Sequence, residues 1–173
     1  EIGVRTIFNI LGPLTNPANP KGQLIGVFDE NLTEKICNVL KILNLERAIV
    51  VSSNGMDEIS NIFETKISEL RNGEIKNYYL NFEKFGFEKA EINDLKGGDA
   101  KENAEIIRKI LNNDKSEEIL KKRDVVLLNA AAGIIVGKKA DNFEEGIEIA
   151  KESIESGNAI KKLEEMIKFT NEV

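Results

Sequence analysis

Two adjacent carboxylates, Asp57 and Glu58, are the residues of this sequence best suited to chemistry. They follow an apolar run, Ala48 to Val51, and a turn that contains Gly55. A short apolar run bounded by turn residues predicts a buried strand, and open α/β sheets bind ligands at the loops that follow their parallel strands. Carboxylates in such a loop can hold Mg²⁺, which bridges the phosphate oxygens of a substrate. A simpler interpretation stays open, in which Asp57 only caps the turn that follows it.

The rest of the composition limits which chemistry is available. Histidine does not occur among the 173 residues, which removes the commonest general base and the commonest transition-metal ligand. Any reaction must therefore depend on carboxylates, amides, backbone groups and cations. The single cysteine, Cys37, lies on the apolar side of a predicted helix, so we expect it to be buried packing and not a nucleophile. One cysteine allows no internal disulfide, which suits a cytoplasmic protein.

Charge and hydropathy exclude two classes of partner. The net charge is −6 and the isoelectric point is about 5.0, whereas binding of nucleic acid needs a basic face. No apolar run approaches the ~20 residues that cross a bilayer. We therefore expect neither nucleic acid nor a membrane as a partner. The apolar share of 41% and the charged share of 31% are typical of a globular domain.

The elements that would position Asp57 and Glu58 form an α/β pattern. A predicted strand from Gln23 to Phe28 precedes a predicted helix from Leu32 to Leu43, with Asn31 as its candidate cap. The strand from Ala48 to Val51 comes next, so strand, helix and strand form a parallel βαβ unit. Asn72-Gly73 between two alternating runs predicts a β-hairpin. The expected fold is a central, mostly parallel sheet flanked by helices, with a peripheral hairpin.

Helices are predicted for the second half of the chain. Asp99 and Glu102 have the spacing of a capping box, and the helix they open carries an apolar stripe that we expect to be buried, made of Ala104, Ile107, Ile110 and Leu111. The segment Val125 to Val136 begins like a strand but is too long for one, so we interpret it as a helix. Two further helices are expected, at Phe143 to Glu155 and at Asn158 to Phe169.

One loop has a composition found nowhere else in the chain. All three prolines, Pro13, Pro17 and Pro20, lie within eight residues and follow an apolar run. The stretch RTIFNILGPLTNP, Arg5 to Pro17, resembles the signature of the anthranilate phosphoribosyltransferase family of tryptophan biosynthesis. The similarity continues through three further motifs and so spans nearly the whole chain: Gly55 to Ser60, Gly97 to Ala100 and Asn129 to Ala132.

The resemblance implies roles for specific residues. In that family an aspartate and a glutamate at the positions of Asp57 and Glu58 coordinate the Mg²⁺ that accompanies phosphoribosyl pyrophosphate. Gly12 and Pro13 match the part of the signature that lines the anthranilate pocket. The implied reaction transfers the phosphoribosyl group from phosphoribosyl pyrophosphate to anthranilate. Gly97 to Asp99 is not the family's phosphate loop, and we interpret it as a turn and a helix cap.

The resemblance also implies that residues 1–173 are the C-terminal part of the family's α/β domain. On that view the chain is a fragment of a two-domain protein, inactive alone and homodimeric when complete. Two alternatives remain at this point: a related phosphorylase-like transferase with another acceptor, and a non-catalytic homologue that binds nucleic acid.

Overall fold

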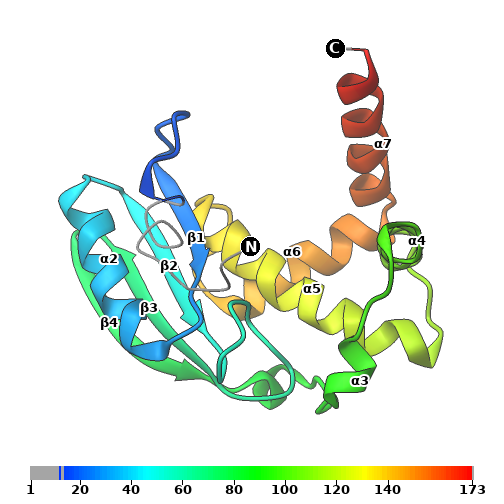
Figure 1. The fold of residues 1–173 in the computed structure, drawn as a ribbon, viewed down its shortest axis with the longest axis horizontal. Helices are drawn as coiled ribbons and strands as arrows, with labels where there is room; N and C mark the ends of the chain where they lie inside the picture. The colour runs from blue at the N-terminus through cyan, green and yellow to red at the C-terminus, as the bar shows by residue number, and fades with distance from the viewer. Residues whose placement is uncertain (1–11, 13, 173) are drawn as a thin grey trace, which may run out of the picture. The chain divides into compact units, whose positions relative to one another are not determined.

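The computed structural model describes Gly12 and residues 14–172, and these divide into two compact units (Figure 1). The first unit comprises residues up to Glu58 together with Thr65–Leu80, and the second comprises Ile59–Glu64 and the chain from Asn81 onward. The carboxylate pair therefore ends the first stretch of the first unit.

A four-stranded sheet forms the centre of the first unit. Its strands are β1 (Gly22–Gly26), β2 (Arg47–Ser52), β3 (Thr65–Arg71) and β4 (Glu74–Leu80), in that order across the sheet. β1 and β2 are parallel, whereas β3 pairs antiparallel with β2 and β4 pairs antiparallel with β3. The α/β class and the βαβ unit are thus confirmed. The sheet is mixed and not mostly parallel within the described residues, because the hairpin extends it and does not stand apart.

The crossover between the two parallel strands supplies the core of this unit. A 3-10 turn, η1 (Glu30–Leu32), leads into α2 (Thr33–Ile42), and Figure 1 shows α2 lying across the sheet. Asp29, not Asn31, caps this entry, since its carboxylate accepts the Asn31 backbone N–H. Helical spacing buries one face of α2 against alternate strand positions. The buried cluster consists of Ile25, Val27, Ile36, Cys37, Leu40, Ala48, Val50 and Leu70.

The hairpin between β3 and β4 follows from its two turn residues. Asn72 has φ of 53° and Gly73 has φ of 78°, and a turn with positive φ at both central residues matches the right-handed twist of the strands. The register runs from Arg71 opposite Glu74 to Thr65 opposite Leu80. The hairpin prediction is confirmed.

Helices build the second unit. They are η2 (Phe82–Phe85), α3 (Ile92–Leu95), α4 (Ala100–Leu111), α5 (Glu117–Val136), α6 (Phe143–Glu155) and α7 (Asn158–Asn171). α5 and α6 pack side by side (Figure 1), and a β-carbon added to Gly146 would lie 2.9 Å from the Ala131 β-carbon. This close approach buries the apolar faces of both helices. In the described chain, no helix is both long and apolar enough to span a membrane.

Sequence and structure differ for two of these helices. The helix expected from Val125 to Val136 begins earlier in the structure, at Glu117, because the residues before Val125 are also helix formers. The stripe expected to be buried on α4 is wrong: Ile110 is the buried residue of α4, whereas Ile107 is 48% exposed. Periodicity identified an apolar face on α4, but it could not show which of its residues other elements would bury.

Candidate functional site

The chain leaves β2 through a second Asn-Gly turn. Ser53 and Met56 exchange both backbone hydrogen bonds, at 2.9 and 3.0 Å. Between them Asn54 has φ of 48° and Gly55 has φ of 92°, the same signs as in the hairpin turn. The lead-in to the carboxylates therefore forms a tight two-residue turn, and glycine at position 55 avoids the strain that a side chain would meet there.

Asp57 lies against the last residue of β1. A β-carbon built on Gly26 would stand 1.4 Å from the Asp57 carbonyl oxygen, so the two backbones are in direct contact. Since β1 and β2 are parallel, this contact puts Asp57 at the carboxyl edge of the pair. The position agrees with the expectation from the βαβ pattern. Gly26 was not singled out from the sequence, although a glycine inside a strand pattern often marks such a close approach.

The two carboxylates are near enough to interact. Asp57 is exposed and Glu58 is half-buried. Burial raises the pKa of the Glu58 carboxyl above its usual range, and the hydrogen bond and charge of Asp57 raise it further. Residues 57–64 contain no helix, so Asp57 has no helix to cap. The interpretation that Asp57 caps the turn that follows it stays open beside the metal-binding role.

The carboxylate oxygens of Asp57 and Glu58 are suitable ligands for Mg²⁺. Both groups offer carboxylate oxygen, and Mg²⁺ usually takes one or two carboxylates and completes its shell with water and substrate phosphates. No group of three or more His, Cys, Asp or Glu side chains able to hold a metal occurs among the described residues. The pair is therefore a candidate site for a hard cation that arrives with a phosphate-bearing substrate.

The segment after the carboxylates is held by α5. The Ile59 backbone N–H donates to Asn129 Oδ1 at 3.0 Å, and Asn129 Nδ2 donates to the Ile59 carbonyl at 2.7 Å. Sequence reasoning gave Asn129 no role. A polar residue in the otherwise apolar run Val125 to Val136 was the signal that could have identified it.

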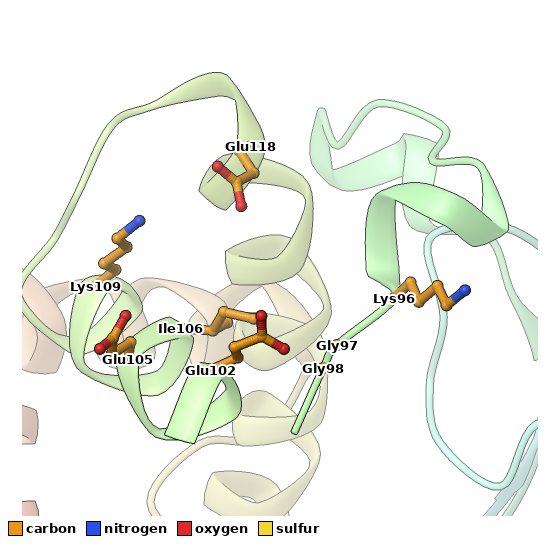
Figure 2. A pocket seen from close by; sticks show the side chains of 8 residues that line it. All are labelled: Lys96, Gly97, Gly98, Glu102, Glu105, Ile106, Lys109 and Glu118. Carbon is orange, nitrogen blue, oxygen red and sulfur yellow. The ribbon is translucent and has the colours of Figure 1, made fainter. Parts of the chain in front are cut away.

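The Gly97-Gly98 segment borders a pocket of about 270 Å³ (Figure 2), lined by Lys96, Gly97, Gly98, Glu102, Glu105, Ile106, Lys109 and Glu118. The capping box predicted here is confirmed. Asp99 accepts the Lys101 and Glu102 backbone N–H groups, and Glu102 accepts that of Asp99 at 2.9 Å. Figure 2 shows Glu102 beside the two glycines.

These two glycines leave room for the side chains that cap α4, and they do not form a phosphate-binding loop. A β-carbon on Gly98 would lie 1.7 Å from Glu102 Oε2, and one on Gly97 would lie 2.2 Å from Asn103 Oδ1. The Gly98 N–H donates to Asn103 Oδ1 at 2.9 Å. The Gly98 and Asp99 N–H groups, which a phosphate loop would present, are thus already bonded within the chain. Carboxylates as well as two lysines border the pocket.

The predicted acceptor pocket has only one described residue. Gly12 is exposed. Pro13 lies outside the described residues. The anthranilate-binding role of both residues stays a prediction.

Comparison with known proteins places the chain in a class. The profile described as "Glycosyl transferase family, a/b domain" matches residues 1–160. The chain belongs to this glycosyl transferase family.

Its relatives within the family carry a more specific name. The chain is 54% identical over 172 residues to an anthranilate phosphoribosyltransferase of Acetivibrio thermocellus, covering 99% of this chain and 49% of that protein. It is 47% identical over 167 residues to the enzyme of that name in Methanocorpusculum labreanum, covering 96% and 48%. The chain thus spans about half the length of the curated relatives it matches.

Solved structures that resemble this chain carry the same name as these relatives. The anthranilate phosphoribosyltransferase of Thermus thermophilus superposes with a TM-score of 0.86 at 35% identity, over 96% of this chain and 48% of that one. The Saccharomyces cerevisiae enzyme in complex with PRPP and Mg superposes with a TM-score of 0.84 at 28% identity, over 99% and 49%.

Proposed function

We propose that this chain is the C-terminal half of an anthranilate phosphoribosyltransferase. The complete enzyme would transfer the phosphoribosyl group from phosphoribosyl pyrophosphate to anthranilate and release pyrophosphate. The observation that carries the proposal is the position of Asp57 and Glu58, paired at the carboxyl edge of the β1–β2 sheet. Relatives with this name match at 47–54% identity over nearly the whole chain, which supports it.

The reaction makes specific demands on the site. The anthranilate nitrogen forms a bond to ribose carbon C1 and loses a proton, while the bond from C1 to the pyrophosphate oxygen breaks. Negative charge grows on the departing pyrophosphate, and Mg²⁺ would offset that charge. Asp57 and Glu58 would hold the ion through their carboxylate oxygens and so orient the pyrophosphate. An aromatic amine is already nucleophilic, so a chain without histidine can take part in this chemistry.

The acceptor end of the site is assigned to Gly12 and Pro13. Pro13 would offer a flat apolar wall to the anthranilate ring, and Gly12 would permit its close approach. The acceptor pocket and the carboxylate pair would then bind different substrates, and changes in one should leave affinity for the other substrate intact.

An assay of the full-length enzyme tests the proposal. Anthranilate is fluorescent and its fluorescence falls as it is consumed, so we expect a decrease that requires both Mg²⁺ and phosphoribosyl pyrophosphate. Nucleobases offered in its place, and nucleosides offered with phosphate, should give no turnover. Turnover of these compounds without consumption of anthranilate would replace the proposed function with that of a phosphorylase-like transferase.

Three further properties belong to the same proposal. The enzyme is cytoplasmic, it is a homodimer when complete, and the 173-residue chain alone does not turn over. Catalysis depends on a site that positions both reactants, which can contribute about 10⁵ M or more in effective molarity. Light scattering of the full-length protein tests the dimer. Incubation of the isolated chain with both substrates and Mg²⁺ tests the third property, and turnover near the intact rate would contradict it.

A further inference from the structure

Asn129 satisfies both backbone polar groups of one buried residue. Its Oδ1 accepts the Ile59 N–H at 3.0 Å, and its Nδ2 donates to the Ile59 carbonyl at 2.7 Å and to the Val125 carbonyl at 2.9 Å. The amide therefore uses its acceptor and donors together. Ile59 is fully buried and lies outside any helix or strand, so no ladder hydrogen bonds are available to it.

An asparagine is the side chain that this geometry needs. A carboxylate could accept from the N–H but could not donate to the carbonyl, and an apolar side chain could do neither. The bond spans 70 positions of sequence, so it is a tertiary constraint on where Ile59 lies within the second unit. Ile59 is the residue directly after Glu58.

The residue directly before Glu58 is constrained as well. The Asp57 carbonyl lies against the backbone of Gly26, where even a methyl group would overlap it, at 1.4 Å. Backbone that meets backbone cannot yield by rotating a side chain. Glu58 is thus flanked by two positions that are each held by a residue distant in sequence.

We infer that Asn129 and Gly26 are positioning residues for the Asp57–Glu58 pair, holding the backbone on either side of Glu58 so that both carboxylates are set for one divalent cation. This inference rests on the proposed function. Neither residue has to touch the ion or the substrate. Partners that orient metal ligands in this way typically contribute about 10- to 100-fold to metal affinity.

The chain supplies a matched control for Asn129. Asn103 grips Gly98 with the same pair of bonds, its Oδ1 accepting the Gly98 N–H and its Nδ2 donating to the Gly98 carbonyl, both at 2.9 Å. That clamp serves the start of α4, and the carboxylates beside it, Asp99 and Glu102, accept backbone N–H groups there. Asn129→Ala and Asn103→Ala therefore remove the same interaction from two places, only one of which adjoins the Asp57–Glu58 pair.

The experiment measures binding of Mn²⁺, a paramagnetic substitute for Mg²⁺, to the full-length protein with phosphoribosyl pyrophosphate present. We expect Asn129→Ala and Gly26→Ala to raise the Mn²⁺ Kd about tenfold, and Asn103→Ala to leave it unchanged. In steady-state assays the KM for phosphoribosyl pyrophosphate at limiting Mg²⁺ should rise, while the KM for anthranilate stays the same. Asn129→Gln, which keeps the donor and the acceptor, should recover part of the affinity.

Specific outcomes would overturn the inference. A purely structural role predicts a lower Tm with unchanged Mn²⁺ affinity in the folded fraction, or equal changes in both KM values. If Asn129→Ala fails to fold, the Mn²⁺ affinity of Gly26→Ala alone tests the inference. Suppose that the Asp57→Asn, Glu58→Gln double variant still consumes anthranilate and binds Mn²⁺ normally. This result would show that the pair does not hold the cation, and it would refute the positioning roles of Asn129 and Gly26 without contradicting the transferase function. Wild-type protein that binds Mn²⁺ at the pair but never consumes anthranilate would refute the function alone.

Discussion

Two acidic segments of this chain look alike in sequence but differ in the partners of their carboxylate oxygens. Asp57 lies two residues after Gly55 and Asp99 directly after Gly98, and each acidic segment adjoins a residue whose backbone is bonded by an asparagine amide. The Asp99 carboxylate accepts two backbone N–H groups of α4 and Glu102 accepts a third, so these acids complete a helix start. Asp57 and Glu58 interact with each other, and the Glu58 carboxyl also accepts the Asp57 backbone N–H. The second pair of acids is thus engaged by the start of a helix, whereas the first pair brings two carboxylates together as the ligands of one cation would be.

The largest effect should come from removing the charges of the first pair. In the full-length enzyme, Asp57→Asn with Glu58→Gln should lower kcat/KM for phosphoribosyl pyrophosphate about 100-fold at limiting Mg²⁺, or about 2.7 kcal/mol, because the metal loses its anionic ligands. Initial rates across a Mg²⁺ series measure this. Asp99→Asn with Glu102→Gln is the control and should keep the wild-type Mg²⁺ dependence. Equal losses in the two double variants would erase the distinction between the segments.

The two Asn-Gly turns allow a finer separation of stability from function. Gly55 and Gly73 both have positive φ, so alanine at either position should cost about 1 kcal/mol of unfolding free energy. Only Gly55→Ala should also raise the Mg²⁺ requirement, since its turn leads to Asp57. Urea denaturation and Mg²⁺ titration of both variants give the two readouts. A Mg²⁺ effect in Gly73→Ala would show that loss of stability alone weakens the site.

Loss of the cap should affect stability without affecting the metal. Asp99→Ala leaves the first N–H groups of α4 without their carboxylate, which typically costs about 1 kcal/mol. We expect a lower urea midpoint and an unchanged Mn²⁺ Kd in this variant. A change in Mn²⁺ affinity would mean that α4 contributes to the candidate site.

A further acid, Asp124 on α5, extends the comparison to the stability of the second unit. Burial, opposed by the charges of Arg123 and Lys151 and aided by that of Glu88, raises the pKa of Asp124 to about 6. A folded-state pKa above the unfolded value gives a stabilising contribution that is complete below about pH 3.8 and is lost as pH rises through about 6.

Asp124→Asn should therefore be more stable than the parent at pH 8 and equal to it below pH 4. We expect a gain of about 1 kcal/mol, smaller than the shift alone implies because solvent screens a half-exposed carboxylate. Urea midpoints at the two pH values check this. A gain of the same size at both would show that the charge of Asp124 is not its cause.

Local features of the fold could be predicted from the sequence, and contacts between distant segments could not. Asn72-Gly73 and the Asp99 capping box depend on neighbours within a few residues, so their signals are contained in short windows. The approach of Gly26 to Asp57 and the grip of Asn129 on Ile59 join segments far apart in the chain. The exposure of Ile107 belongs to the same category, because periodicity identifies an apolar face but not its partner.

For the candidate site, the place of Asp57 and Glu58 after a predicted strand made them candidates, and the family resemblance selected them, because the chain has 30 acidic residues whose oxygens could suit Mg²⁺. What sequence could not provide was the backbone support of the pair. Gly12 and Pro13 were selected by resemblance alone, and their role stays a prediction.

The buried thiol of Cys37 gives this protein a built-in reporter of local opening. Cys37 is fully buried on α2, its Sγ donates to the Ser68 carbonyl, and burial raises its pKa to about 12. An alkylating reagent should therefore modify it only in molecules whose first unit has opened. Since the sequence has no second cysteine, the rate of alkylation monitors α2 and its sheet separately from the helices of the second unit. The time course of labelling in mild urea, read by mass spectrometry beside the loss of helical signal, would show whether the two units unfold together or one after the other.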